Sequence, residues 1–137
     1  MTDSRRSLEV LLDGSVVFAS EGKWLHPLLD LERFLLGSSL NPAALSLRDK
    51  IVGRAAALLI VRLRIPEVHA GLLSRLGEQV LLASGVRYTC GERTGRIACL
   101  TEEILEGVDD PEEAHRIVVA RAAASRAGAA ASARDDR

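Results

Sequence analysis

The chain opens with two runs of strand-forming residues on either side of a turn dipeptide. Ser7 to Ser20 reads SLEVLLDGSVVFAS, with Asp13-Gly14 at its centre. Because Asp-Gly readily adopts the positive φ angles of a two-residue hairpin turn, this pattern predicts a β-hairpin. Its two strands are expected to be antiparallel.

After Gly22 the apolar residues take up the spacing of a helix. The segment Trp24 to Leu36 reads WLHPLLDLERFLL, and its large apolar residues recur every three or four positions. Pro27 suits the first turn, where a missing N–H costs nothing. We therefore predict a helix that ends at the glycine and serines following Leu36.

The most apolar run of the chain follows a brief predicted strand at Ala44 to Leu47. From Ile51 to Val61 only Arg54 is charged. A helix that is apolar on nearly every side is buried by its neighbours. Asp49 stands in the position of an N-cap, whose side chain accepts hydrogen bonds from the first turn. We predict a buried central helix beginning after Asp49 and ending before Pro66.

Strand and helix patterns continue to alternate beyond Pro66. Predicted strands cover Glu67 to Leu73 and Val86 to Cys90. Between them lies a short predicted helix, Leu76 to Ser84, with Gly85 as a suitable C-terminal glycine. This order of elements favours a layered α/β domain with a mixed sheet, in which the strands joined through helices are partly parallel.

The last third of the chain is predicted to be mainly helical. A polar loop from Gly91 to Arg96 leads to a short helix, Cys99 to Gly107. Asp110-Pro111 followed by two glutamates is typical of a helix start, and that helix is predicted to reach about Ala124. Residues 126–137 offer no core side chain and are predicted to form a flexible tail, so residues 1–125 make up one domain.

Composition excludes several classes of function. The 137 residues are 47% hydrophobic and 27% charged, which is typical of a soluble globular domain. A net charge of -1 and an aromatic content of 3% argue against a nucleic-acid partner. The sequence contains no apolar run of membrane-spanning length, and its polar N-terminus does not resemble a secretory signal. We expect a cytoplasmic protein without membrane contact.

Metal-binding patterns are absent from the sequence. The three histidines, His26, His69 and His115, are far apart, and eight residues separate Cys90 from Cys99. Zinc sites place their paired cysteines two to four residues apart. We therefore expect no metal and no cofactor. Without a secretory context, both cysteines are expected to be free thiols.

The first candidate binding motif is Asp49-Lys50-Ile51-Val52-Gly53-Arg54, at a predicted strand-to-helix junction. Open α/β sheets bind ligands outside the carboxyl ends of their strands, and a helix N-terminus favours an anion. Lys50 and Arg54 would strengthen that preference. The alternative is structural: Asp49 caps the helix, Gly53 packs closely and the two basic side chains are solvated.

The second candidate motif is Glu92-Arg93-Thr94-Gly95-Arg96, which leads to Cys99 and Glu102. A glycine among polar residues can expose backbone N–H groups that bind an anion. Cys99, close to a helix start, is also a candidate nucleophile. The alternatives are a plain surface loop, an inert buried cysteine and a glutamate on an exposed helix face.

Several of these motifs together resemble a known but uncharacterised family. They are Pro27-Leu28-Leu29-Asp30-Leu31, the run from Asp49 to Leu59, Arg93-Thr94-Gly95 with Cys99, and Asp109 to Ala114. The family is a "domain of unknown function" family of short bacterial and archaeal proteins with a cytidine-deaminase-like fold. The resemblance extends from about Ser7 to Ala120, and Asp-Lys-x-x-Gly-Lys/Arg-Ala-Ala-Ala is its most specific part.

This resemblance implies a three-layer α-β-α sandwich around a mixed sheet of about five strands. It does not imply deamination. The zinc deaminases carry a His or Cys followed by Ala-Glu, and a Pro-Cys-x-x-Cys at a later helix. The first motif is absent where this chain has Val52-Gly53-Arg54, and only Cys99 corresponds to the second. Fold analogy alone does not carry activity.

These patterns leave three functional hypotheses. The first is a small anionic ligand, a nucleotide or phosphorylated metabolite, bound where two helix N-termini meet. Its predicted contacts are Asp49, Lys50, Gly53, Arg54, Arg93, Thr94, Gly95, Cys99 and Glu102. The second is a homodimeric structural or regulatory protein without catalysis, and the third is an enzyme that uses Cys99. The first requires Lys50, Arg93 and Cys99 to surround one cavity.

Overall fold

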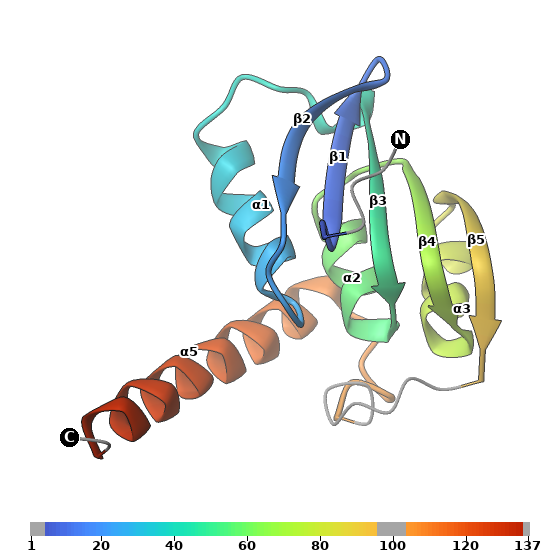
Figure 1. The fold of residues 1–137 in the computed structure, drawn as a ribbon. Helices are drawn as coiled ribbons and strands as arrows, with labels where there is room; N and C mark the ends of the chain where they lie inside the picture. Colours follow the sequence, from blue (N-terminus) through green and yellow to red (C-terminus); the bar gives the residue numbers. More distant parts are fainter. Residues whose placement is uncertain (1–4, 96–103, 136–137) are drawn as a thin grey trace.

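The computed structural model describes residues 5–95 and 104–135, and from residue 125 onward the backbone alone. The chain folds around one five-stranded sheet (Figure 1). Its elements in chain order are β1 (Leu8–Leu12), β2 (Ser15–Ser20), α1 (His26–Leu36), the 3-10 turn η1 (Pro42–Ala44), β3 (Leu45–Val52), α2 (Arg54–Arg62), β4 (Glu67–Ser74), α3 (Arg75–Ala83), β5 (Arg87–Thr94) and α5 (Pro111–Asp135).

The sheet is mixed, in the order β2-β1-β3-β4-β5. β1 is antiparallel to both β2 and β3, whereas β3, β4 and β5 are parallel. The hairpin turn has φ angles of 52° at Asp13 and 83° at Gly14, as a type I′ turn requires. The predicted α/β class, the hairpin and the mixed five-stranded sheet are therefore confirmed.

The described helices pack over one face of the sheet. α2 and α3 lie behind β3, β4 and β5 in the view of Figure 1. The ring of Phe18 in β2 lies 5.2 Å from that of Phe34 in α1, on the side of β2 that faces the core. One core cluster joins strand residues such as Leu47 with Leu31 of α1 and Leu58 of α2. Of the expected α-β-α layers, the described residues provide the sheet and this helical layer.

Two predicted boundaries near the first motif are wrong. Asp49 to Val52 belong to β3 rather than to a helix, because their backbones pair with Ala70 to Leu73 of β4. α2 begins at Arg54, and its N-cap is Gly53, so Asp49 does not cap it. The apolar run is divided between two elements, and Ile51 is consequently 52% exposed on the sheet.

The predictions after β4 also need correction. The segment Gly91 to Thr94, expected as a loop, continues β5, because its pairing with β4 extends to Ser74 and Thr94. The last helix, α5, runs past Ala124 to Asp135. Most of the predicted helix from Cys99 to Gly107 lies outside the described residues.

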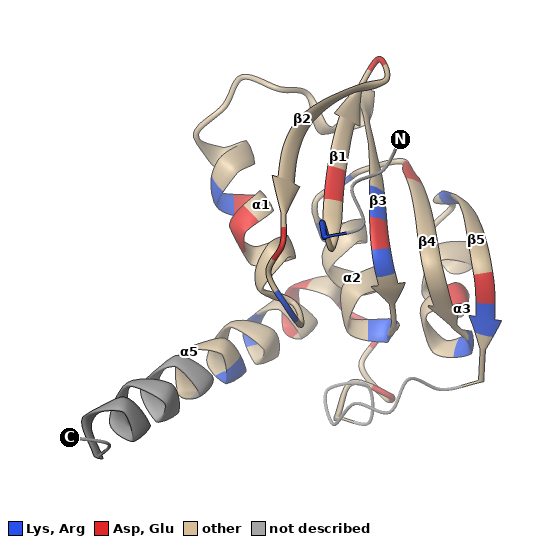
Figure 2. Cartoon of the chain, viewed as in Figure 1, with Lys and Arg blue, Asp and Glu red and all other residues tan. Residues whose placement is uncertain are grey.

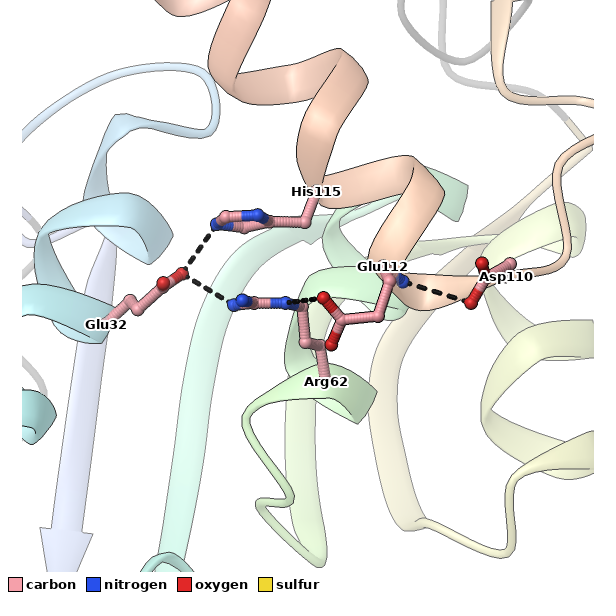
Figure 3. A network of polar contacts seen from close by, with 5 residues as sticks. All are labelled: Glu32, Arg62, Asp110, Glu112 and His115. Atoms are coloured by element: carbon pink, nitrogen blue, oxygen red, sulfur yellow. Dashed lines mark hydrogen bonds and ion pairs between the residues drawn. The ribbon is translucent and has the colours of Figure 1, made fainter.

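The first half of α5 is fastened to the body of the domain by a polar network (Figure 3). The carboxylate of Glu32 in α1 lies 2.8 Å from both Arg62 Nη1 of α2 and His115 Nε2 of α5. Arg62 Nε also donates to Glu112 Oε2 at 3.1 Å, and Asp110 accepts from the Glu112 N–H at 3.2 Å. α1, α2 and α5 are therefore joined at one point, beyond which α5 extends away from the sheet (Figure 1).

The approach of α3 to the β3–α2 junction allows no side chain at Gly77. A Cβ there would lie 2.9 Å from the carbonyl oxygen of Val52 and 3.0 Å from that of Gly53. Both neighbours are backbone atoms, so they cannot move aside as a flexible side chain can.

We predict that Gly77→Ala destabilises the protein by about 1–3 kcal/mol, because the helix must move away from the junction. Helix propensity alone would give a gain of up to ~1 kcal/mol, so a loss is diagnostic of the contact. Urea unfolding measures the difference. Gly95→Ala is the control, since nothing lies within 4 Å of its Cβ position, and equal behaviour of the two variants would contradict the prediction.

Candidate functional site

The candidate site is a cavity of about 500 Å³ at the carboxyl end of β3. It lies between the start of α1 and the start of α2, and the segment before β1 forms a further wall. In open α/β sheets this end of a strand is where ligands bind. Its lining includes Arg5, Glu21, Lys23, Trp24, Asp49, Lys50, Gly53, Ala55 and Ala56.

The first turns of two helices bound this cavity without side-chain caps. The N-cap of α2 is Gly53, which has no side chain to donate or accept, and Ala55 and Ala56 of the first turn line the cavity. The N-cap of α1 is Leu25, and it makes no side-chain cap bond either. The first N–H groups of a helix have no partner within the helix, and they attract anions. At the start of α2 these groups favour negative charge in the cavity. The start of α1 does not add to this, because Pro27 has no N–H and the N–H groups of His26 and Leu28 donate to the carbonyls of Lys23 and Leu25.

The charged side chains of the cavity are mainly basic. Three basic residues, Arg5, Lys23 and Lys50, line it together with two acidic ones, Glu21 and Asp49. The carboxyl group of Asp49 is partly neutral near pH 7, because its pKa is raised to about 7. The local charge thus adds to the attraction that the start of α2 exerts on an anion.

Asp49 is a titratable group in the wall of the site. It pairs in the sheet with Leu8 and Ala70, so its side chain shares the helix-covered face with these two core residues. Its Oδ1 accepts a hydrogen bond from the Ile51 N–H at 3.4 Å. Burial raises the pKa of Asp49, and the backbone hydrogen bonds from Ile51 and Lys50 oppose this rise only in part. Near neutral pH the group can donate or accept a proton.

Trp24 forms the aromatic part of the wall. Its φ angle is 57°, in the left-handed region that bulky residues rarely adopt. Its ring meets that of His26 edge-on at a centroid distance of 5.0 Å, and the residue is 37% exposed. An exposed indole beside basic groups can stack against a flat or sugar-like part of a ligand.

The structure brings together only part of the predicted site. Asp49, Lys50 and Gly53 line the cavity. Trp24, Lys23 and Arg5 were missed, because their position depends on how the chain before α1 folds back toward β3. The one local signal was Gly22-Lys23-Trp24 just before a proline-marked helix start.

Arg54 was predicted to contact the ligand, but the structure places its side chain outside the cavity. It is 5% exposed, and its guanidinium donates to the carbonyl of Leu105 at 2.6 Å and to that of Val108 at 2.7 Å. It also forms an ion pair with Asp109. These bonds direct the side chain toward the segment before α5, so it does not line the cavity.

The second motif also lies elsewhere. Arg93 is at the end of β5, two strands from Lys50, and its Nε lies 3.1 Å from Glu78 Oε2 of α3. The hydrogen bond from Tyr88 and the contact with Arg93 lower the pKa of Glu78. Thr94 and Gly95 follow Arg93 and do not line the cavity either. The predicted contacts Cys99 and Glu102 lie outside the described residues.

The side chains of residues 5–95 and 104–124 form no evident metal centre. In that part of the chain no three His, Cys, Asp or Glu residues gather in a way that could hold a metal ion. None of the described helices has the length and apolar character needed to cross a membrane.

Comparison with known proteins shows that one family model covers every residue that lines the cavity. The family described as "Domain of unknown function (DUF1893)" matches residues 3–121. The chain belongs to the DUF1893 family. It is also similar to the crystal structure of a DUF1893 family protein from Thermotoga maritima, with 26% sequence identity and a TM-score of 0.75, covering 85% of this chain and 80% of that one. No curated protein matches it.

We predict that Asp49→Asn stabilises this DUF1893 protein at pH 8 but changes little at pH 4. The folded-state pKa of Asp49 is about 7, above the ordinary value of 3.8. Ionising the Asp49 carboxyl group therefore costs more free energy in the folded protein than in the unfolded chain. Its stability therefore falls as the pH rises from about 4 to 7, by ~2–4 kcal/mol. Asparagine removes this loss. Urea unfolding at both pH values tests it, and a variant no more stable at pH 8 than the wild type contradicts the prediction.

We predict that Arg54→Leu lowers the free energy of unfolding by about 2–4 kcal/mol, because it removes the buried guanidinium bonds to the carbonyls of Leu105 and Val108, of which the Leu105 carbonyl keeps only the Val108 N–H as a donor. Asp109→Asn is the matched control. Its carboxylate is 93% exposed, so its loss should cost less than about 1 kcal/mol. Thermal and urea unfolding compare the two, and similar losses would show that the ion pair, rather than the buried carbonyl bonds, is what matters.

Proposed function

We propose that this DUF1893 protein is a cytoplasmic binding protein for a small anionic metabolite, a nucleotide or other phosphorylated compound. The ligand occupies the cavity between α1 and α2. The observation that carries the proposal is that the uncapped start of α2 and three basic residues, Arg5, Lys23 and Lys50, line one cavity of about 500 Å³. A phosphate group is the anion that such an arrangement binds best.

Each part of the cavity has a role in this proposal. The N–H groups at the start of α2 and the ammonium group of Lys50 hold the phosphate. Trp24 packs against the remainder of the ligand. Asp49 supplies a hydrogen-bond donor when neutral and an acceptor when ionised, so that it discriminates among the polar groups of the ligand.

The cytidine-deaminase-like fold is part of the same proposal. It is supported by the sequence resemblance and by a mixed sheet in which an antiparallel hairpin extends three parallel strands. The zinc-binding sequence motifs of the deaminases are absent from the chain. The function proposed is therefore binding of a ligand and not zinc-dependent deamination.

A homodimeric interaction role is the second candidate. The observation in its favour is the exposure of large apolar side chains on helices that pack on the core, with Leu36 79% exposed and Leu82 64% exposed. Light scattering tests it: a dimer that Leu36→Ser or Leu82→Ser converts to a monomer supports this role, and a monomer at all working concentrations contradicts it.

We predict that at least one member of a panel of nucleotides and sugar phosphates raises the melting temperature of the protein. A ligand at 100 times its Kd stabilises the native state by about 2.7 kcal/mol. Lys50→Ala should weaken binding of that ligand about 10-fold or more, because it removes a charge-assisted contact. Lys50 is exposed, so the unliganded melting temperature should change little.

Arg33→Ala is the control variant for this experiment. Arg33 is also an exposed basic residue, but it pairs with Asp30 on α1 and does not line the cavity. It should bind the ligand as the wild type does. Absence of any shift across the panel at millimolar concentration, or equal loss of affinity in both variants, contradicts the proposed function.

A further inference from the structure

The candidate cavity has an apolar side as well as a basic one. Its larger apolar lining residues are Trp24, Leu25, Pro27 and Ile51. Leu25 and Pro27 are buried, whereas Trp24 is 37% exposed and Ile51 is 52% exposed. Two large apolar residues at the same cavity thus keep surface that a ligand could cover. A phosphate group gains nothing from such surface, so this side of the cavity suits another part of the ligand.

The register of β3 explains where the exposed surface of Ile51 lies. Asp49 pairs with Ala70 of β4 and Ile51 pairs with Leu72, so Asp49 and Ile51 lie on the same face of the sheet. Leu47, two positions before Asp49, belongs to the core on that face. Ile51 is nevertheless half exposed and lines the cavity. The cavity therefore lies over the end of the face that the helices cover elsewhere.

Charged and apolar residues follow one another directly on two sides of the cavity. β3 carries three charged residues in succession and then ends on two aliphatic ones, which Figure 2 shows as three coloured positions before an uncharged strand end. Lys50 is thus followed by Ile51, and before α1 Lys23 is followed by Trp24. All four residues line the cavity. A ligand that matches this lining carries an anionic group next to an apolar one.

The conformation of Trp24 indicates that its indole has a role other than folding. Its φ angle of 57° is one that asparagine and glycine adopt far more readily than a bulky residue does. The indole does not belong to the core cluster, and it meets the ring of His26 edge-on. Residues in strained conformations are often found where a ligand is held. Flat heteroaromatic rings stack well on an indole.

Resting on the proposed function, we infer that the ligand is a phosphate monoester of a planar heteroaromatic compound, such as a nucleoside monophosphate, and not a sugar phosphate. Its ring lies against Trp24 and Ile51, and its phosphate lies at the start of α2 beside Lys50. Asp49 bonds to an N–H group or a ring nitrogen at the edge of the ring. The cavity, at about 500 Å³, has the size of a small-molecule site.

Isothermal titration calorimetry on the full chain tests this inference. The ring-bearing probes are the four common ribonucleoside 5′-monophosphates and pyridoxine 5′-phosphate. Ribose 5-phosphate is the comparison, because it has the phosphate and the sugar of the nucleotides but no ring system. At least one ring-bearing probe should bind the wild type 10-fold or more tightly than ribose 5-phosphate does. Comparing the nucleotides with pyridoxine 5′-phosphate then shows which kind of ring the cavity takes.

Fluorescence reports directly on the placement of the ring. Trp24 is the only tryptophan of the chain, so the tryptophan emission comes from the cavity wall alone. A nucleotide that stacks on the indole should quench this emission at saturation, whereas ribose 5-phosphate should leave it nearly unchanged. A nucleotide that prevails in the calorimetry but does not quench the emission would place the ring elsewhere and overturn the inference.

Two variants remove the apolar contacts. Trp24→Asn suits the φ angle and Ile51→Thr keeps a β-branched side chain, so both should fold. Each should lower the affinity for the ring-bearing probe about 5-fold or more and leave that for ribose 5-phosphate unchanged. Trp24→Phe, which keeps an aromatic ring, should retain most of the affinity. Val16→Thr is the matched control, because Val16 is an exposed β-branched residue of β2 outside the cavity, and it should bind as the wild type does.

The outcomes separate the inference from the proposed function. Equal affinity for ribose 5-phosphate and every ring-bearing probe overturns the inference and leaves the proposed function standing. A preference for the ring that survives in both Trp24→Asn and Ile51→Thr does the same. Binding of no ring-bearing probe also overturns the inference, and the sugar phosphates of the wider metabolite panel then decide the proposed function separately.

Discussion

The structure depends on the buried guanidinium of Arg54 at the start of α2. A buried cation is tolerated only where its N–H groups find acceptors, and Arg54 finds the carbonyls of Leu105 and Val108. These bonds tie the first turn of α2 to the segment that leads into α5. Because Gly53 alone separates α2 from β3, the same bonds hold the end of β3 beside the first turn of α2.

The arrangement of charge in the site follows from that junction. Successive side chains of a strand point to opposite faces of the sheet, so Asp49 faces the helices whereas Arg48 faces the open side. Lys50, near the end of the strand, borders the candidate cavity. One short stretch of β3 therefore supplies polar groups to both sides of the sheet edge.

The features that could be predicted from the sequence are those set by local chemistry. Asp13-Gly14 determined the hairpin, and the proline-marked starts of α1 and α5 were found because capping and proline geometry act within one turn. Asp49 to Val52 could not be assigned, since a short apolar run fits a strand or a helix equally well. This segment is a strand because it pairs with β4, which is distant in sequence. The same pairing converts Gly91 to Thr94 from a loop into β5.

Under the proposed function, the candidate cavity would couple the binding of an anion to the protonation of Asp49. Asp49, with a pKa of about 7, titrates in the neutral range within a cavity whose other charges are mainly basic. A phosphate bound beside it disfavours the ionised carboxylate and raises its pKa further. By linkage, ligand binding above pH 7 then takes up a proton, and affinity decreases as the pH rises. A basic cavity that includes a carboxyl group with a raised pKa thus gains a dependence on pH that its lysine and arginine side chains alone would not give it.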